Sequence, residues 1–248
     1  MKVVKKMIKP LLFLSALVLS ATNIYGQLVR FQQQGKVGYK DEQGKIVVFP
    51  QYDAGGPMKN GYAIVLKGNK RGYIDASGKE AIDLKYDDAS QFENGLACVQ
   101  SGSKYGFING NGSWVIQPMF DQAFGFVDGL ARVKRNNKWG MINTLGTVVV
   151  PMIYDALLHP SLGLTAAFLN GKYGFIDNMG KVAIDFKFNE ATPFDSISRR
   201  AIVRKDSKRW FINPRGKYLE EIETHEEEEN KERRERARKR KNELKAQH

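Results

Sequence analysis

Acidic residues recur at a fixed spacing and are the first candidates for chemistry. Asp53, Asp87, Asp121 and Asp155 are 34 residues apart, and each follows an aromatic residue. Repeated carboxylates could bind calcium or line a path for cations. Each aspartate also precedes a loop, where its side chain commonly caps the backbone of its own turn. Because neighbouring members are a full repeat apart, we expect this aspartate column to be structural.

Basic residues gather in two places and could bind an anionic partner. The first cluster combines four cations with one tryptophan: Arg132, Lys134, Arg135, Lys138 and Trp139. The second cluster is purely cationic: Arg199, Arg200, Arg204 and Lys205. Such side chains could hold an acidic glycan or an acidic protein surface, with the aromatic rings adding cation–π contacts. The alternative is an ordinary solvated surface that keeps strand edges unpaired.

The remaining reactive side chains match no catalytic or metal-binding motif. Cys98 is the single cysteine, which excludes an intrachain disulfide and a cysteine-rich zinc site. The three histidines, at positions 159, 225 and 248, are widely separated. No serine lies in a nucleophile-elbow pattern, and no phosphate-binding glycine loop precedes a helix. We therefore expect no catalytic residue, no metal site and no cofactor.

A 34-residue period positions all of these residues. A first glycine column consists of Gly38, Gly72, Gly106, Gly140 and Gly174. A second column lies six residues further on, at Gly44, Gly78, Gly112, Gly146, Gly180 and Gly216. A third consists of Gly61, Gly95, Gly129 and Gly163. Since these columns, the aromatic residues and the aspartates keep one register, residues 27–222 are predicted to form one repeat domain.

The repeats are predicted to be all-β. Two or three glycines per period would break a helix pair, because each costs about 1 kcal/mol inside a helix. Between the first two glycine columns lies a hairpin signal, as in Asp75-Ala76-Ser77-Gly78. After the third column, segments such as Ala131-Arg132-Val133 keep small apolar outer residues while the middle residue varies. This alternation predicts a strand with one free face, to which Cys98 and the other variable residues would belong.

The count of six hairpins and six further strands fits two architectures. One is an open, twisted array whose neighbouring units cover each other's faces. The other is a closed six-bladed ring that pairs the first strand with the last hairpin. We favour the open array, because 34 residues are few for a four-stranded blade.

The two ends of the chain differ from the repeats. Residues 1–26 combine four lysines with a short apolar run, which is typical of a secretory signal cleaved after Gly26; an uncleaved anchor helix is the alternative. Residues 223–248 hold acid-before-base pairs four residues apart and are predicted to form a solvated helix or a disordered tail. Its basic stretch, residues 233–241, could instead bind a polyanion. The formal charge of +12 divides into +4 on residues 1–26, +9 on residues 27–219 and −1 on the remainder.

The repeated motif resembles the bacterial WG-repeat family. The resemblance rests on Trp139-Gly140-Met141-Ile142 and on Tyr105-Gly106-Phe107-Ile108 in the preceding period, together with the downstream glycine and the Tyr-Asp pair. Val37 and Arg71 depart from it by replacing the aromatic residue, and the last copy has no glycine after Trp210. The last copy is therefore expected to be a capping unit. The resemblance implies an interaction module, often exported or associated with the envelope, with no assigned reaction.

These features together predict an exported, non-catalytic binding or scaffold module in the periplasm or outside the cell. Its expected partner is a protein or an anionic glycan of the envelope; we expect no nucleic-acid partner and no membrane span in the mature chain. The alternative is an envelope enzyme that acts on glycan with carboxylates meeting at a central channel. A third hypothesis is a spacer that holds the charged tail away from a membrane.

Overall fold

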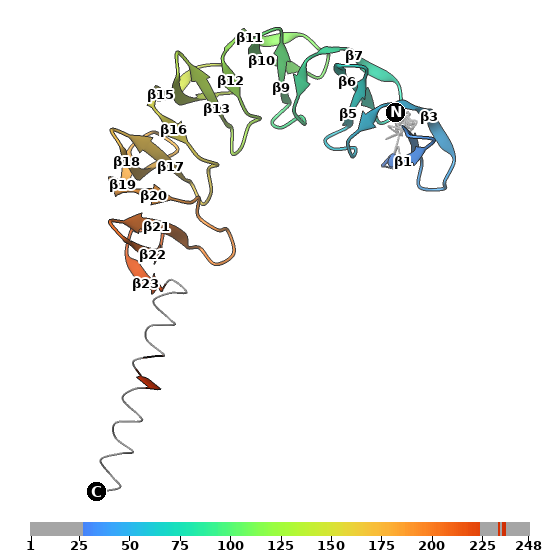
Figure 1. The fold of residues 1–248 in the computed structure, drawn as a ribbon. Helices are drawn as coiled ribbons and strands as arrows, with labels where there is room; N and C mark the ends of the chain where they lie inside the picture. The colour runs from blue at the N-terminus through green and yellow to red at the C-terminus, as the bar shows by residue number, and fades with distance from the viewer. Residues whose placement is uncertain (1–26, 224–232, 234, 237–248) are drawn as a thin grey trace, which may run out of the picture.

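The chain folds into six antiparallel β-sheets that follow one another along an open arc (Figure 1). A computed structural model describes residues 27–223, 233, 235 and 236, and every regular element in residues 27–223 is a strand. The first and last sheets lie at opposite ends of the arc, so no ring is closed. The all-β prediction and the preference for an open array are therefore confirmed.

We number the sheets 1 to 6 in chain order. Sheet 1 contains β1 (Val29–Gln33), β2 (Lys36–Lys40) and β3 (Ile46–Tyr52). Sheet 2 contains β4 (Ala54–Gly55), β5 (Tyr62–Lys67), β6 (Lys70–Asp75) and β7 (Glu80–Tyr86). Sheet 3 contains β8 (Asp88–Ala89), β9 (Leu96–Ser101), β10 (Lys104–Asn109) and β11 (Trp114–Phe120).

The second half repeats this order. Sheet 4 contains β12 (Gln122–Ala123), β13 (Leu130–Arg135), β14 (Lys138–Asn143) and β15 (Val148–Tyr154). Sheet 5 contains β16 (Ala156–Leu157), β17 (Leu164–Leu169), β18 (Lys172–Asp177) and β19 (Val182–Phe188). Sheet 6 contains β20 (Glu190–Ala191), β21 (Ala201–Lys205), β22 (Lys208–Ile212) and β23 (Tyr218–Ile222).

Sheets 2 to 6 each have four strands, the first of which is only two residues long. Each two-residue strand follows the long last strand of the preceding sheet after a single residue, as Asp53 links β3 to β4. The expectation that 34 residues are few for a four-stranded unit was therefore wrong. The open array, which we favoured for that reason, is nevertheless the observed architecture. The additional strand needs only two residues because it directly continues the path of the last strand of the preceding sheet.

The predicted hairpin turns are confirmed. In sheet 2, Oδ1 of Asp75 accepts the backbone N–H groups of Ser77 at 2.8 Å and Lys79 at 3.1 Å. Gly78 completes this turn with a φ of +82°, in the left-handed region that glycine adopts at no steric cost. An Asp or Asn takes the same part in the other five sheets, at Asp41, Asn109, Asn143, Asp177 and Asn213.

The first glycine column marks a close approach between two strands. A Cβ on Gly106 would lie 2.6 Å from the carbonyl oxygen of Ile116, because the register of β10 against β11 shifts at this point. In sheet 6 the pairing of β22 with β23 stays regular through Trp210, which lies opposite Glu221. The last copy can therefore carry a tryptophan where the others need glycine.

The core consists of five apolar clusters, one between each pair of successive sheets. Both faces of the inner sheets are covered, so the predicted free face does not exist there. The variable residue lies on the second strand of each four-stranded sheet and faces the following sheet; Cys98, at this position of β9, is only 4% exposed. Cys98 is therefore a core residue and not the outward-facing spare residue that the alternation suggested.

The two terminal sheets end the array differently. On sheet 1, Val29 is 46% exposed and Phe31 is half-buried, whereas the matching residues of sheet 2, Ala63 and Val65, are fully buried. On sheet 6, Glu220 replaces the buried Val or Ile of the other sheets and forms an ion pair with Arg200 at 3.6 Å. The guanidinium of Arg200 also lies 5.6 Å from the ring centre of Phe211. The last unit is thus a charged cap.

The predicted signal segment, residues 1–26, lies outside the described residues. So does the predicted tail helix, apart from residues 223, 233, 235 and 236. Among the residues that the structure describes, no helix is long and apolar enough to cross a membrane.

Candidate partner-binding site on the concave face

The aspartate column joins neighbouring sheets. Asp53 accepts a hydrogen bond from Nζ of Lys36 at 2.5 Å and another from the backbone N–H of Gly68 at 2.6 Å. Lys36 belongs to the hairpin of sheet 1 and Gly68 to that of sheet 2, so one carboxylate ties two turns together. The hydrogen bond from Lys36 lowers the pKa of Asp53 below its usual value. Asp87 and Asp121 bind the equivalent lysine and backbone groups, and Asp155 pairs with its lysine.

The column has a structural role, as expected, but Asp53, Asp87 and Asp121 each bind the turns of two hairpins and do not cap their own turn. The acids lie one at each sheet junction and are engaged by lysine. They do not meet at a central channel, which is the arrangement that the glycan-enzyme alternative requires. The described residues also contain no group of three or more His, Cys, Asp or Glu side chains that could hold a metal ion.

Loops that follow the two-residue strands project toward the concave side of the arc (Figure 1). We call them the inner loops: residues 56–61, 90–95, 124–129, 158–163 and 192–200. In the second of them, Asn94 and Gly95 have φ of 51° and 78°, and Glu93 pairs with Leu96 across the turn. Two successive positive φ values define the tight turn that the third glycine column requires. Because the first four inner loops share this turn, their geometry is fixed by the backbone.

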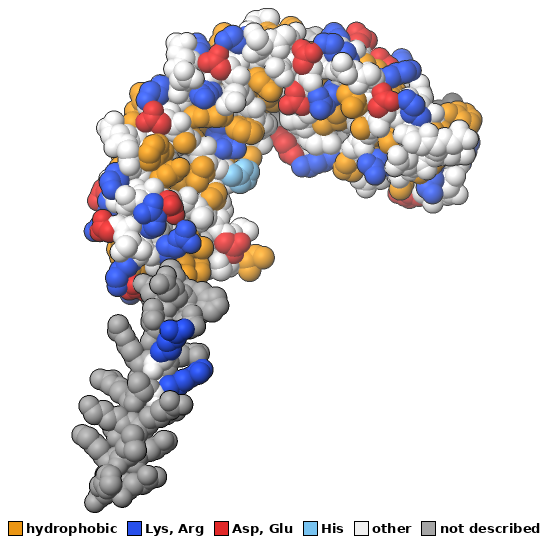
Figure 2. Space-filling view, viewed as in Figure 1, with side chains coloured by type: hydrophobic (Ala, Val, Ile, Leu, Met, Phe, Trp, Pro, Cys, Tyr) orange, Lys and Arg blue, Asp and Glu red, His pale blue; other side chains and the backbone are white. Residues whose placement is uncertain are grey.

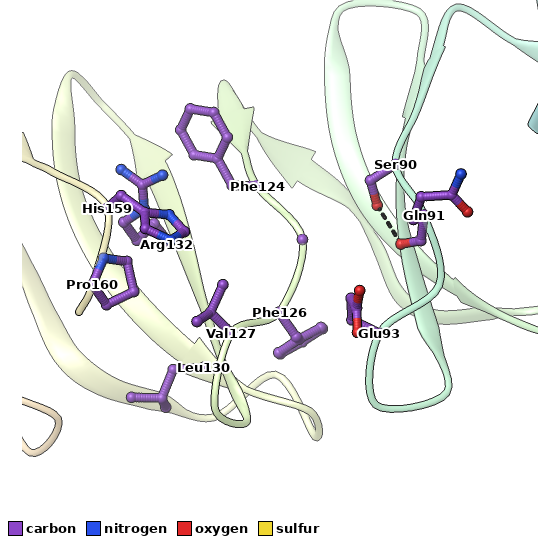
Figure 3. A pocket seen from close by; sticks show the side chains of 11 residues that line it. Ser90, Gln91, Glu93, Phe124, Phe126, Val127, Leu130, Arg132, His159 and Pro160 are labelled. Atoms are coloured by element: carbon purple, nitrogen blue, oxygen red, sulfur yellow. Dashed lines mark hydrogen bonds between the residues drawn. The ribbon is translucent and has the colours of Figure 1, made fainter. Parts of the chain in front are cut away.

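A pocket of about 290 Å³ lies between inner loops of sheets 3, 4 and 5. We call it the Phe124 pocket; it is lined by Ser90, Gln91, Glu93, Phe124, Gly125, Phe126, Val127, Leu130, Arg132, His159 and Pro160. Figure 3 shows Phe124, Arg132, His159 and Pro160 on one side of it and Ser90, Gln91 and Glu93 on the other. Figure 2 shows hydrophobic and histidine atoms side by side on the concave side, and His159 is the single histidine among the described residues.

Phe124 is the most exposed apolar side chain of this pocket, with 47% of its surface accessible. Its ring stacks on Trp139, with centroids 5.6 Å apart and planes 18° from parallel. The guanidinium carbon of Arg132 lies 4.3 Å from the Phe124 ring centre, and Nζ of Lys134 lies 5.8 Å from that of Trp139. An exposed aromatic ring is therefore held in place by a tryptophan and a cation.

Arg132 is half-buried, and its Nη1 donates a hydrogen bond to the carbonyl oxygen of Leu157 at 2.7 Å. Burial lowers the pKa of Arg132 below its usual value, but an arginine side chain stays charged at neutral pH. Within residues 27–223 it forms no ion pair. The pocket thus contains a partly desolvated cation whose charge no carboxylate of the described chain balances.

The structure brings together three residues of the first predicted cluster and separates the other two. Arg132 and Trp139 contact Phe124 and Lys134 lies over the ring of Trp139, whereas Arg135 is exposed at the tip of the hairpin. Lys138 is engaged by Asp155 at 2.5 Å. The second cluster is dispersed: Arg200 pairs with Glu220 and Arg204 with Glu190, while Arg199 and Lys205 are exposed.

Sequence reasoning missed Phe124, the central side chain of the pocket. The residues at the same position of the other repeats are Gly56, Ser90, Leu158 and Thr192, so an aromatic residue in this column was an available signal. Its significance depends on the neighbouring columns that place Arg132 and Trp139 beside it.

Comparison with solved structures shows a likeness of fold alone. A crystal structure described as that of the eukaryotic initiation factor matches with a TM-score of 0.51 and 10% identity over 78% of this chain. The chain spans 62% of the length of that protein. Hsv2 of Kluyveromyces lactis matches with a TM-score of 0.46 and 9% identity, over 77% of this chain and 72% of that one. No curated protein matches the chain in sequence.

The repeats themselves match one family model, described as the WG containing repeat. It matches five times in succession, at residues 38–70, 72–105, 105–139, 139–173 and 173–208. Each match spans about one 34-residue period, and together they cover well over half of the chain. The protein therefore belongs to the family of WG containing repeat proteins.

Proposed function

We propose that this protein is an exported, non-catalytic scaffold that binds another protein through the concave face of its arc. The observation that carries the proposal is the Phe124 pocket, where an exposed, stacked aromatic ring lies among loops of three successive sheets. Exposed aromatic residues beside arginine are the side chains that most often anchor protein interfaces. Repeat arrays commonly bind partners along such concave surfaces.

The rigidity of this surface supports the same function. The first four inner loops share one tight turn, and the sheets that carry them are joined by five apolar clusters and by the lysine–aspartate pairs. A preformed surface loses little conformational entropy on binding, which favours affinity. The distribution of the acids at the sheet junctions, each engaged by lysine, supports a binding role over glycan hydrolysis.

An experiment with matched variants tests the proposal. The purified chain is immobilised, and proteins retained from an envelope extract are quantified for the wild type, Phe124→Ser and Phe49→Ser. Phe49 is 72% exposed and lies on sheet 1, so its variant removes an even more accessible ring outside the pocket. We expect a defined set of proteins to be retained by the wild type and by Phe49→Ser but lost with Phe124→Ser. The same retained set for all three chains would refute binding through the concave face.

The export component has a separate test. Expression of the full chain followed by cell fractionation and N-terminal sequencing should yield an exported protein that begins at Gln27. A protein that keeps residues 1–26 in the cytosolic fraction would refute export and leave the binding proposal standing.

An anionic glycan is the second candidate partner, because Lys134 and Arg132 flank two stacked aromatic rings. Acidic sugars combine an anionic group with a ring that can lie on such a surface. Co-sedimentation with peptidoglycan and with an anionic polysaccharide, in low and high salt, distinguishes this partner from a protein.

A further inference from the structure

Arg132 occupies a position that four of the other five sheets fill with apolar residues. In the other inner sheets and in sheet 6 the same position of the second strand holds Ile64, Cys98, Ala166 and Ile202. Cys98 and Ala166 are buried between sheets there. Burying a cation in this position opposes folding unless another group compensates the charge.

Arg30 on sheet 1 serves as an internal comparison. It lies three periods before Arg132, and its Nη1 donates the same hydrogen bond, to the carbonyl oxygen of Gly55 at 3.0 Å. Arg30 is exposed at the end of the array, whereas Arg132 is half-buried against Phe124. The backbone hydrogen bond is therefore common to both positions, and the desolvated, aromatic surroundings are particular to Arg132.

The guanidinium of Arg132 retains capacity for a ligand. It carries five N–H donors, and one of them is used by the carbonyl of Leu157. A carboxylate needs a pair of donors on one edge of the guanidinium, and at least one such edge remains. Stacking on Phe124 holds the guanidinium plane in position, which reduces the entropy lost when an anion binds.

The other polar groups around the pocket leave Arg132 as the side chain to which an anion is attracted. His159 lines the pocket on the side of Arg132. Glu93 lines the opposite side and forms an ion pair with Lys59. An anionic group is therefore attracted toward Arg132, while the carboxylate of Glu93 is already neutralised by its lysine.

The remaining lining is mostly apolar, and the volume is small. Phe124, Phe126, Val127, Leu130 and Pro160 contribute aromatic and aliphatic surface. A volume of about 290 Å³ is at the lower end of ligand pockets, so it suits one or two side chains. A sugar ring would leave several hydroxyl groups against this surface without hydrogen-bond partners.

We propose that the Phe124 pocket binds a carboxylate side chain together with an adjacent apolar side chain of a partner protein, with Arg132 binding the carboxylate. The ligand is thus a short peptide segment in which Asp or Glu neighbours an aromatic or aliphatic residue. The proposal rests on the proposed function, because it names the chemistry of the partner that the concave face recognises.

Two peptides that differ only in charge test this assignment. Ac-Gly-Glu-Phe-Gly-NH2 and Ac-Gly-Gln-Phe-Gly-NH2 are titrated into the purified chain, with binding followed by NMR chemical shifts. The variants are Arg132→Met, which places an apolar side chain where the other sheets have one, and Arg30→Met, which removes the equivalent backbone hydrogen bond outside the pocket. We expect the glutamate peptide to bind the wild type and Arg30→Met at least tenfold more tightly than it binds Arg132→Met. The glutamine peptide should bind all three chains weakly.

Equal affinity for the two peptides, equal binding by Arg132→Met, or no binding of either peptide at millimolar concentration would overturn the assignment. Binding of glucuronate oligosaccharides through Arg132 in place of the peptide would overturn it in favour of an acidic glycan. A thermal unfolding midpoint for Arg132→Met at or above that of the wild type verifies that the variant is folded. If Phe124-dependent protein retention persists in Arg132→Met, the scaffold function stands and only the carboxylate assignment fails.

Discussion

Replacing Gly106 by alanine should destabilise the array, although alanine is the better residue in most strands. The Cβ of Gly106 would lie 2.6 Å from the carbonyl oxygen of Ile116, 2.8 Å from the nitrogen of Pro118 and 2.9 Å from the carbonyl carbon of Gln117. All three are backbone atoms of β11, so no side-chain rotation can relieve the contact. An ordinary contact begins at 3.4 Å, and β11 must therefore retreat by about 0.8 Å.

The cost follows from two opposing effects. Inserting a methyl group into a packed site costs about 1–3 kcal/mol when the surroundings must shift. Alanine also restricts the unfolded chain, which stabilises the folded state by about 0.4–1 kcal/mol. The net expectation for Gly106→Ala is a loss of about 1–2 kcal/mol. For a domain of this size, such a loss lowers the Tm by about 2–8 °C.

Gly125→Ala is the matched control, because its Cβ would lie 3.5 Å from Oγ of Ser90 and meet no closer atom. With no clash and no positive φ at Gly125, this variant should be as stable as the wild type or more stable by up to about 1 kcal/mol. Urea unfolding followed by far-UV circular dichroism, together with thermal scans, gives both values. If Gly106→Ala is as stable as Gly125→Ala, the close approach of β10 to β11 is not the reason for glycine in the first column.

Three further predictions concern the repeats. The hydrogen bond from Lys104 lowers the pKa of Asp121 in the folded chain. The ionised carboxylate therefore contributes its full stabilisation at pH values above its unfolded pKa of about 3.9. This stabilisation is lost as the pH falls through the folded pKa. Asp121→Asn should therefore reduce the fall in Tm between pH 5 and pH 2 relative to the wild type, and an unchanged pH profile would contradict this role. Asn143→Ala removes two hydrogen bonds to the backbone of its turn and should cost about 1–2 kcal/mol in urea unfolding; a change below about 0.3 kcal/mol would show that the turn forms without them. Burial raises the pKa of the Cys98 thiol to about 12, so a thiol reagent at pH 8 should modify Cys98 only when urea unfolds the chain, and rapid labelling of the native chain would place the thiol outside the core.

The features that recur with the period could be predicted from the sequence. The six hairpin turns depend on local chemistry, an Asx side chain and a glycine with positive φ, and local chemistry is visible in each copy. The family resemblance depends on the same columns. The period together with this local chemistry therefore predicted the all-β class and the number of repeated units.

What could not be predicted is how the units cover each other. A period-2 pattern shows which residues vary, but variation does not distinguish a solvated face from a face packed on a neighbouring sheet of different composition. The position of Cys98 varies because each facing sheet accommodates a different side chain there, Ile64, Cys98 or Ala166. The variation does not mean that the position is exposed to water. The two-residue strands have no propensity signal at all, since their pairing is imposed by the strand that precedes them.

The candidate site is unpredictable for a related reason. Its residues come from six positions of the repeat and from three sheets, and each position on its own is compatible with packing or solvation. Only the curvature of the arc brings the inner loops that carry Phe124 and His159 to one concave surface. The basic cluster identified in sequence contained Arg132 and Trp139 but also Lys138, which the aspartate column engages.

The chemistry of the two ends explains why this array stays open. Sheet 1 has three strands within the described residues, with β1 at its edge and Val29 and Phe31 on its outer face. At the other end, Glu220 and Arg200 place charges on the face that would have to cover this apolar surface. Closing a ring would bury this ion pair against the apolar side chains of Val29 and Phe31, which cannot form hydrogen bonds with it. The free energy needed to remove the two charges from water would exceed the free energy gained from the apolar contact. The open arc, with its accessible concave face, is therefore the expected state of this sequence.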